Sequence, residues 1–325
     1  YQINNTQRDA VVAVRELNID GNPARNWIND HLVYTHGFGF VAAYGNTVDA
    51  DGKPNFIVGD LPPTAGLGKF EPRIYFGENV PDYSIIGGNS KTDVEFDYPD
   101  DASPNGQKNT TYKGKGGVPV GNLFNRLVFT IKYQEQRILL SNLINSESKI
   151  LFNRNPRERV SKVAPWLTLD GDPYPAVVDG KIKWIIDGYT TSAGYPYAQK
   201  TTLSGSTSDA LTANSNSITA QSNQTINYIR NSVKATVDAY DGTVSLYEWD
   251  VADPVLKTWA KAYPGVIKPK SEISEKLMAH LRYPEDLFKV QRDILSSYHV
   301  QNALAFYGGQ DFWRVPRDPS TFGGN

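Results

Sequence analysis

The feature that most constrains this sequence is a two-residue turn between two runs of β-forming residues. Tyr174–Val178 leads into Asp179-Gly180, and residues 181–186 (KIKWII) follow. Asp-Gly between such runs is a strong short-range signal for a β-hairpin, because the turn that fits needs a positive φ at both positions. A second such turn, Asp241-Gly242, precedes the run 243–247. The sequence therefore predicts antiparallel strands joined by tight turns.

Other strands are expected in the first third of the chain. Residues 10–14 (AVVAV) favour a strand, although their spacing also fits a helix. Residues 73–76 (RIYF) and 83–86 (YSII) are short runs between turn-forming residues, and we expect them to pair with each other. Pro23 is expected to open a short helix that reaches Val33, since proline is favoured in the first turn of a helix.

Helices are indicated by apolar residues three or four apart and by Asn or Asp before proline. These signals predict helices over residues 120–133, 155–163 and 225–240, and further helices from Asp253, from Ser271 or Ser274, and from Pro284. Strands mixed with unevenly spaced helices indicate an α+β fold. We expect mixed, mostly antiparallel strands and hairpins with a helical C-terminal third.

The composition excludes several kinds of site and partner. The 325 residues include no cysteine, so disulfides, zinc–thiolate sites and cysteine nucleophiles are impossible. The 33 basic and 35 acidic side chains give a formal net charge of −2, which argues against a nucleic-acid partner. No apolar stretch reaches the roughly 20 residues that a membrane-spanning helix needs. No cofactor is evident from the sequence.

The length suggests one large domain over residues 1–325. A subdivision would place a strand- and loop-rich part at 1–118 and a mixed part at 119–325. Residues 198–224 are mostly Ser, Thr, Asn, Ala and Gln, and we expect a flexible low-complexity loop there. The chain begins with Tyr and ends without a helix-closing pattern, so we interpret it as a piece excised from a longer protein.

Two neighbouring histidines are the first candidate metal ligands. His31 and His36 are five residues apart and do not share a helix face, so the zinc-protease pattern is absent. They could meet if one lies at a helix end and the other in the glycine loop that follows. The alternative is that each is hydrogen-bonded in or near the core. Asp170-Gly171-Asp172 could also bind a hard cation, but ordinary turn chemistry explains it as well.

The glycine-rich segment 114–117 (GKGG) suggests phosphate binding at first sight. The P-loop pattern, however, needs Ser or Thr directly after the lysine and a strand before the loop. Here Gly-Gly-Val-Pro follows Lys115. We therefore expect an ordinary loop that leads into the helix at Val120.

Aromatic residues make up 12% of the chain, and one stretch concentrates them beside acids. Rings and carboxylates together form sugar-binding platforms, because sugar C–H faces stack on rings and carboxylates accept hydroxyl protons. The alternative is that these side chains fill a loop-rich core and its rim. The candidate ligand-binding residues are Trp184, Asp187, Tyr189, Tyr195, Tyr197 and Asp241. Two of the three acids Asp187, Asp238 and Asp241 could also form the carboxyl pair of a glycosidase, if their separation in the fold suits it.

Several phrases of the sequence resemble one protein family along nearly the whole chain. They include RELN (15–18), PRIYFGE (72–78), GGVP (116–119), DPYP (172–175), DGYTT (187–191), NYIRNSVK (227–234) and DAYDG (238–242). The chain is similar to the large extracytoplasmic region of an uncharacterised protein family (UPF class) of bacterial, chiefly actinobacterial, multi-pass membrane proteins. The resemblance implies transmembrane helices before this region and further soluble sequence after it. It carries over no activity and no catalytic residues.

The resemblance implies a place on the extracytoplasmic face of the plasma membrane. We expect envelope-associated binding or scaffolding rather than catalysis. The expected partners are the rest of the parent membrane protein and an envelope glycan or another envelope protein. The alternative is an enzyme or carbohydrate-binding module that acts on cell-envelope glycans through the aromatic and acidic residues of 184–197. That alternative requires these side chains to meet in one open cleft.

Overall fold

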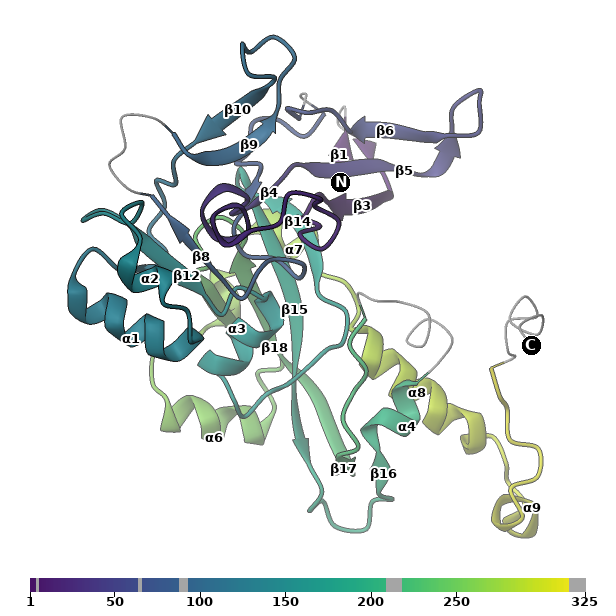
Figure 1. The fold of residues 1–325 in the computed structure, drawn as a ribbon. Coiled ribbons are helices and arrows are strands. Elements are labelled where there is room, and N and C mark those ends of the chain that lie inside the picture. Colours follow the sequence, from purple (N-terminus) through teal and green to yellow (C-terminus); the bar gives the residue numbers. More distant parts are fainter. Residues whose placement is uncertain (4–5, 64–65, 88–92, 209–217, 316–325) are drawn as a thin grey trace, which may run out of the picture.

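The computed structural model describes the chain except residues 4–5, 64–65, 88–92, 209–217 and 316–325. Its centre is a six-stranded sheet in the order β13-β15-β18-β19-β20, with β14 also paired to β15 (Figure 1). All its pairings are antiparallel except that of β19 with β20. The strands are β13 (Thr168–Leu169), β14 (Tyr174–Val178), β15 (Lys181–Ser192), β18 (Tyr228–Asp238), β19 (Val244–Glu248) and β20 (Ile267–Lys268). The expected α+β fold is confirmed.

The Asp179-Gly180 turn joins the two strands that the sequence predicts, and the Asp241-Gly242 turn precedes the strand predicted at 243–247. Val178 of β14 pairs with Lys181 of β15, and Asp179-Gly180 closes the hairpin with φ angles of 53° and 73°. Two positive φ values belong to the turn whose twist matches that of the flanking strands. Gly242, at φ 69°, likewise lies in the turn between β18 and β19.

The helix expected at residues 225–240 is wrong, because this segment forms β17 (Thr225–Ile226) and β18. β18 lies between β15 and β19, and Asn231 to Asp238 are all buried. A strand that is covered on both faces loses the alternation of apolar and polar residues. Its apolar residues can then fall three or four apart by chance, which imitates a helix.

Small sheets made largely by the first half of the chain surround the central one. They pair β1 (Gln2–Ile3) with β2 (Thr6–Gln7), β3 (Ala10–Val14) with β5 (Phe40–Val48) and β6 (Pro54–Val58), β4 (Gly37–Phe38) with β7 (Arg73–Ile74), β9 (Glu95–Pro99) with β10 (Gln107–Thr110), β12 (Lys149–Phe152) with β8 (Tyr83–Ile86) and β11 (Val118–Pro119), and β16 (Thr201–Thr202) with β17. The strand at 10–14 is confirmed.

The expected pairing of 73–76 with 83–86 is wrong. β7 pairs with β4, and β8 pairs with β12, about 65 residues further along the chain. All four residues of β8 are buried, so its sequence lacks the polar face that would indicate register and partner.

The helices are α1 (Leu123–Tyr133), α2 (Arg137–Leu140), α3 (Pro156–Val163), α4 (Leu203–Thr207), α6 (Pro254–Ala262), α7 (Glu275–Met278), α8 (Glu285–Tyr298) and α9 (Ala303–Tyr307), with short helical turns at Asn29–Val33 and Lys270–Glu272. Side-chain caps begin several of them, as the sequence indicated. Asn155 accepts from the backbone N–H groups of the first turn of α3, Asp253 does so for α6, and Ser274 rather than Ser271 caps α7. The N-terminal helical turn begins at Asn29 rather than at Pro23.

Part of the segment 198–224 is structured. Residues 201–207 form β16 and α4, and the Leu203 side chain is fully buried. Residues 209–217 of the expected loop lie outside the described residues.

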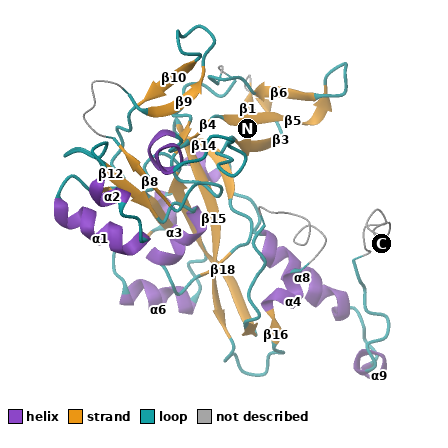
Figure 2. Ribbon diagram, in the orientation of Figure 1, coloured by secondary structure: helices purple, strands orange, loops and turns teal. Residues whose placement is uncertain are grey.

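Helices cover both sides of the long strands β15 and β18, with α1, α3 and α6 on one side of the view in Figure 2 and α4 and α8 on the other. α3 and α8 both contact β18. The largest buried apolar cluster contains Phe40 and Ile74 from the first part of the chain together with Val160, Trp184 and Leu256 from the second. The two parts therefore share one core.

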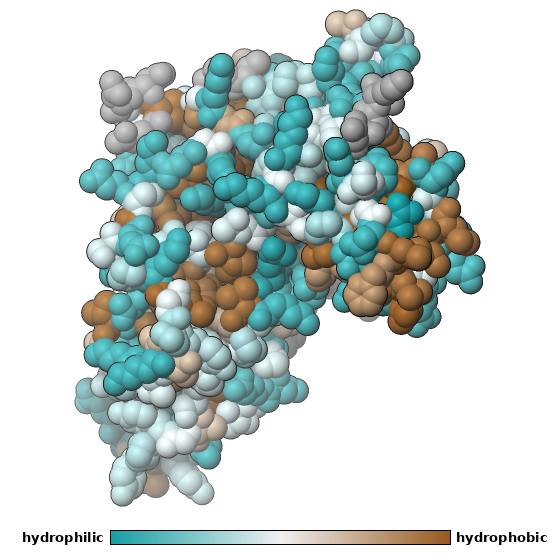
Figure 3. Space-filling model, turned by 90° about the vertical axis from the view of Figure 1, so that its left-hand side faces the viewer, coloured by the Kyte–Doolittle hydropathy of each residue, from teal (hydrophilic) through white to brown (hydrophobic). Residues whose placement is uncertain are grey.

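The surface that includes α1 carries apolar side chains in patches (Figure 3). Leu123, Phe124 and Ile131 of α1 are each about two-thirds to three-quarters exposed, at 73%, 73% and 68%. Phe129 alone among the side chains of this helix is buried. Within the described ranges, no helix is both long enough and apolar enough to cross a bilayer.

Candidate functional site

A cavity of about 490 Å³ lies between the central sheet and the start of α8, and we call it the α8 pocket. Its size is within the range of roughly 300–1,000 Å³ that is usual for small-molecule sites. The sheet contributes Tyr174 and Asp187, the turn after β13 contributes Asp170 and Asp172, and the segment that enters α8 contributes Arg282, Tyr283, Glu285 and Phe288. Acids and aromatic rings from distant parts of the chain therefore meet here.

The floor of the α8 pocket contains a buried ion pair. Asp187 of β15 lies directly opposite Lys234 of β18 in the sheet register, and the Lys234 ammonium contacts the Asp187 carboxylate. The two side chains are only 3% and 1% exposed. Asn231 donates a second hydrogen bond to Asp187 at 2.9 Å. Burial raises the pKa of Asp187, and the charge of Lys234 opposes that rise.

Asp170 connects the turn after β13 to α8. Its carboxylate accepts the Tyr189 hydroxyl and the backbone N–H of Asp286, the latter at 3.0 Å. Asp286 in turn accepts from the backbone N–H of Gly171 at 2.8 Å and from Gln221 at 2.6 Å. Burial and the nearby charge of Asp170 raise the pKa of Asp286 to about 6. These bonds hold the start of α8 against the sheet.

Two carboxyl groups that interact electrostatically line the mouth of the α8 pocket. They belong to Asp172 and Glu285, and burial together with the charge of Glu285 raises the pKa of Asp172 to about 6. Lys289 lies 2.7 Å from Glu285, and the Arg282 guanidinium lies 3.8 Å from Asp172. Near neutral pH the mouth can therefore both donate and accept hydrogen bonds.

Aromatic rings flank these carboxyl groups. Tyr283 and Phe288 are 61% and 56% exposed. The Tyr174 ring is covered instead by the Arg282 guanidinium, which lies 3.6 Å from the ring centroid. The site thus offers two open ring faces beside hydrogen-bonding acids and a guanidinium, which suits a ligand with C–H faces and hydroxyl groups.

The structure does not bring the six predicted ligand-binding residues together. Asp187 lines the α8 pocket, and the Tyr189 hydroxyl reaches Asp170 behind it, but the Tyr189 side chain is fully buried. Trp184 belongs to the main core on the opposite face of β15, and its indole N–H donates to the Phe76 carbonyl at 2.9 Å. Side chains three residues apart in a strand point to opposite faces, so Trp184 and Asp187 cannot contact one ligand.

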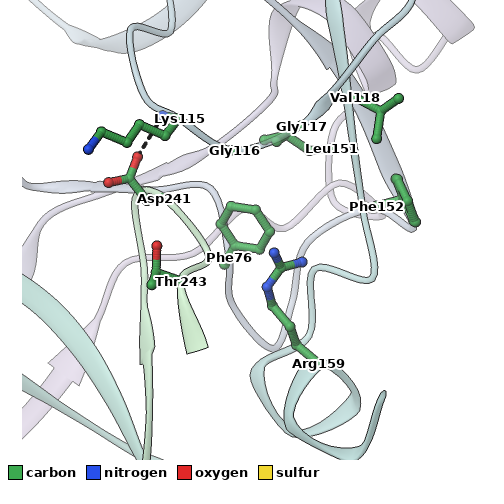
Figure 4. A pocket seen from close by; sticks show the side chains of 10 residues that line it. All are labelled: Phe76, Lys115, Gly116, Gly117, Val118, Leu151, Phe152, Arg159, Asp241 and Thr243. Carbon is green, nitrogen blue, oxygen red and sulfur yellow. Dashed lines mark hydrogen bonds between the residues drawn. The ribbon is translucent and has the colours of Figure 1, made fainter. Parts of the chain in front are cut away.

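The other three predicted residues lie elsewhere. Tyr195 and Tyr197 are exposed in the loop after β15, and Tyr195 stacks on Tyr228. Asp241 lies in the turn between β18 and β19 and lines a second cavity (Figure 4). The Lys181 ammonium lies 3.3 Å from its carboxylate. The aromatic stretch is therefore divided among the core, an exposed loop and two separate cavities.

The two histidines lie in different environments. His31 stacks on the Tyr83 ring, and its Nδ1 lies 2.9 Å from the Tyr83 carbonyl oxygen. His36 is buried, with Nδ1 beside Thr35 and Nε2 3.2 Å from Asp97. Within the described part of the chain, no three His, Cys, Asp or Glu side chains are grouped so that they could hold a metal ion.

Most residues of the α8 pocket are absent from the sequence-based list of site residues. The sequence does show Asp170-Gly171-Asp172 as a compact acidic turn, and the backbone N–H of Asp172 does donate to the Asp170 side chain. Glu285 and Asp286 are typical acids of a first helical turn. Nothing local indicates that segments more than a hundred residues apart place these acids side by side.

Comparison with known proteins decides the family. Residues 1–322 match the family described as Uncharacterised protein family (UPF0182). The chain belongs to this family. The expected resemblance is thereby confirmed, and the UPF0182 relatives found are mostly actinobacterial.

A UPF0182 protein of Streptomyces coelicolor is 56% identical over 100% of this chain and 32% of its own length. One from Bifidobacterium longum is 54% identical over 98% of this chain and 30% of its own length, and one from Frankia alni is 56% identical over 98% and 31%. This UPF0182 chain thus spans about a third of the length of the curated relatives it matches. No solved structure matches it.

Proposed function

We propose that this UPF0182 region is a ligand-binding domain and that the α8 pocket takes a glycan unit of the cell envelope. The observation that carries the proposal is the convergence of the Asp172–Glu285 carboxyl pair, Arg282 and the open rings of Tyr283 and Phe288 around one cavity. Sugar hydroxyls would donate to and accept from the acids and the guanidinium, while a sugar C–H face would stack on a ring.

Binding fits this pocket better than hydrolysis does. Retaining glycosidases hold their two carboxyl groups about 5 Å apart and inverting ones hold them about 6.5–9.5 Å apart, so that a glycosidic bond or a water fits between them. Asp172 and Glu285 instead lie close enough for the charge of Glu285 to raise the pKa of Asp172, and Lys289 lies 2.7 Å from Glu285. The pair serves recognition rather than acid–base attack.

The proposal places the domain on the extracytoplasmic face of the plasma membrane, as part of a longer membrane protein. The expectation of that location comes from the sequence resemblance, and the length of the relatives supports a longer parent. The parent's remaining parts are then a partner of this region. The exposed apolar side chains of α1, including Leu123 and Phe124, are suited to contact with them.

Binding is tested by calorimetry with disaccharide-peptide fragments of peptidoglycan. The variants Tyr283→Ala and Phe288→Ala remove exposed rings and should each lower the affinity at least roughly tenfold, about 1.4 kcal/mol. Tyr298→Ala is the matched control, because Tyr298 is 79% exposed and lies at the far end of α8. It should change the affinity less than about twofold. No binding, or equal loss in all three variants, would reject the proposal.

The location is tested with a single introduced cysteine, because this chain has none. Tyr307 is 93% exposed, and Tyr307→Cys in the full-length parent should react in intact cells with a maleimide that does not cross membranes. The unsubstituted parent measures the background. Labelling of Tyr307→Cys only after cell lysis would contradict the proposed location.

A further inference from the structure

A second cavity, of about 350 Å³, lies beneath the glycine-rich segment 114–117, and we call it the glycine-loop pocket (Figure 4). Residues 115–117 form one wall, Val118 and Phe152 come from β11 and β12, and Phe76 lies in the middle. Arg159 of α3 points up to Phe76 from below. This cavity is separate from the α8 pocket, and the function proposed above does not use it.

The glycines let this segment sit tightly against the turn between β18 and β19. The backbone N–H of Lys115 donates to Asp241 at 2.9 Å. A Cβ atom on Gly116 would lie 2.7 Å from the Asp241 carbonyl oxygen, and one on Gly114 would lie 2.3 Å from the Tyr112 hydroxyl. Close approach to the Asp241 backbone and to the Tyr112 side chain explains these two glycines, and Gly116 and Gly117 leave a part of the wall without side chains that a ligand can approach.

Arg159 carries a positive charge into this cavity without an acidic partner. Its Nε donates to the Gly242 carbonyl, its Nη1 donates to the Asn153 carbonyl at 3.3 Å, and its Cζ lies 4.6 Å from the centroid of the Phe76 ring. Among the described residues, no carboxylate lies within ion-pair distance of it. Burial lowers the pKa of Arg159, as expected for a partly desolvated cation without a counter-charge.

The acid that lines the cavity, Asp241, shares the Lys181 ammonium with Asp238, which lies 2.7 Å from it. Asp241 uses one carboxylate oxygen for the Lys115 backbone and has the Lys181 ammonium 3.3 Å from the other. In Figure 4 the Lys115 side chain extends past Asp241 and away from Phe76 and Arg159, so Arg159 is the cation that points to Phe76. Arg159, Lys115 and Lys181 together face two acids, Asp238 and Asp241, so one positive charge is in excess around the cavity.

We propose that the glycine-loop pocket binds a phosphate group carried on an apolar group. Arg159 has carbonyl partners at Nε and Nη1, and the remaining N–H groups of Nη1 and Nη2 can donate to two phosphate oxygens, a geometry that guanidinium groups favour. The Phe76 and Phe152 rings and Val118 supply apolar contact for the group that carries the phosphate. The phosphate can belong to a soluble ester or to a lipid head group, and both share this chemistry.

The test is calorimetry of this chain with phenyl phosphate, with inorganic phosphate as the probe that lacks the apolar part. We expect phenyl phosphate to bind at least fivefold more tightly than inorganic phosphate. Arg159→Gln should weaken phenyl phosphate binding at least roughly tenfold, and Arg159→Lys should weaken it less, since it keeps the charge but loses the fork. Unchanged affinity in Arg159→Gln, or equal affinity for the two probes, would overturn the proposal.

Arg159 also holds the Gly242 carbonyl, so its variants are paired with substitutions that spare the fold. Thr243 lines the cavity and is exposed, and Thr243→Glu should weaken phenyl phosphate binding at least fivefold by placing a negative charge at the rim. Thr47→Glu, at an exposed position in β5, is the matched control and should leave binding unchanged. Equal effects of the two substitutions would overturn the proposal even if Arg159→Gln failed to fold.

The same chain is then sedimented with vesicles of phosphatidylcholine containing phosphatidic acid. If the chain binds the vesicles and phenyl phosphate displaces it from them, the phosphate belongs to a lipid. If the chain binds phenyl phosphate but not the vesicles, the phosphate belongs to a soluble ester. Both outcomes support the site. Binding of vesicles that phenyl phosphate does not displace would contradict it.

Discussion

Two lysine–aspartate pairs join β15 to β18, and they differ in where along the strands they lie. Lys181 of β15 is 2.7 Å from Asp238 of β18 near the open turn, and its side chain is 43% exposed. Asp187 of β15 contacts Lys234 of β18 further along, and both side chains are almost fully buried. Each pair joins one lysine to one aspartate, with the lysine on β15 in the first pair and on β18 in the second. Burial is therefore the main difference between them.

The difference in burial gives the two lysine–aspartate pairs different roles. The exposed pair is screened by water, and its one ammonium is shared between Asp238 and Asp241 beside the glycine-loop pocket. The buried pair has no water to replace a lost partner, so each charge depends on the other. The same contrast holds for the two cavities. Acids with raised pKa values lie in or beside the α8 pocket, whereas Arg159 at the glycine-loop pocket donates to two carbonyl groups and pairs with no acid among the described residues.

Removing the buried cation should give the largest effect. We expect Lys234→Met to lower the free energy of unfolding by about 3–5 kcal/mol, because it leaves the Asp187 carboxylate buried without its counter-charge. Urea unfolding at pH 7 measures the change. The double variant Asp187→Asn/Lys234→Met removes the orphaned charge and should recover at least about 1 kcal/mol. A cost below about 1 kcal/mol for Lys234→Met would show that the pair is not desolvated as its burial indicates.

The acids beside the buried pair should show in the pH dependence of stability. The pKa of Asp286 is about 6 when folded against 3.8 for the free side chain, so between these values the folded state holds more protons than the unfolded state. Stability contributed by this group is therefore lost as the pH rises from about 4 to 6. Asp286→Asn should remove that loss, up to about 3 kcal/mol.

Urea unfolding of the wild type and of Asp286→Asn at pH 4, 5, 6 and 7 checks the prediction for Asp286. Asn keeps an oxygen that can accept from Gly171 and Gln221. Asp172 has a shift in the same direction and remains in the variant, so some loss of stability with rising pH should persist. Parallel pH profiles for the two proteins would contradict the raised pKa of Asp286.

The tight turn beside the exposed pair should be sensitive to its backbone rather than to its charges. Gly242 has a φ of 69°, and a Cβ atom there would lie 2.4 Å from the Phe76 ring. We expect Gly242→Ala to cost about 2 kcal/mol in the free energy of unfolding, from the positive φ and the contact with Phe76 together.

Gly265 provides the control for the contact in Gly242→Ala. It has a φ of 80°, but a Cβ atom at this position would meet no atom of the described residues within 4 Å, apart from its chain neighbours. Gly265→Ala should therefore cost only the conformational part, about 1 kcal/mol. Equal costs at the two glycines would mean that the Phe76 ring moves aside freely.

Removing the exposed cation should give the smallest effect. Lys181→Met breaks two ion pairs, but a lysine that is 43% exposed is screened by water. We expect the free energy of unfolding to fall by less than about 1 kcal/mol, measured as for Lys234→Met. Moderate salt should reduce even that difference. A cost that approaches the effect of Lys234→Met would remove the contrast between the pairs.

Local sequence signals predicted those parts of the fold that local chemistry controls. The hairpin at Asp179-Gly180 and the caps at Asn155 and Asp253 are confirmed, because turn type and capping depend on a few adjacent residues. The prediction of a helix where β18 lies and the predicted partner of β8 were wrong. Both strands are buried, so their sequences show no alternation of apolar and polar residues. The predicted cluster of ligand-binding residues was divided for a related reason, since Trp184 and Asp187 lie on opposite faces of β15.

The sequence by itself determined the α+β class, the main turns, the exclusion of cysteine chemistry and the family. Only the tertiary structure decided which charges meet. The pairing of Asp187 with Lys234 depends on strand register across β15 and β18, and the pairing of Asp172 with Glu285 depends on how α8 packs on the sheet. The isolation of Arg159 from any acid among the described residues depends on the same packing. Contacts between distant segments are set by burial of the whole chain, which no local pattern of residues contains.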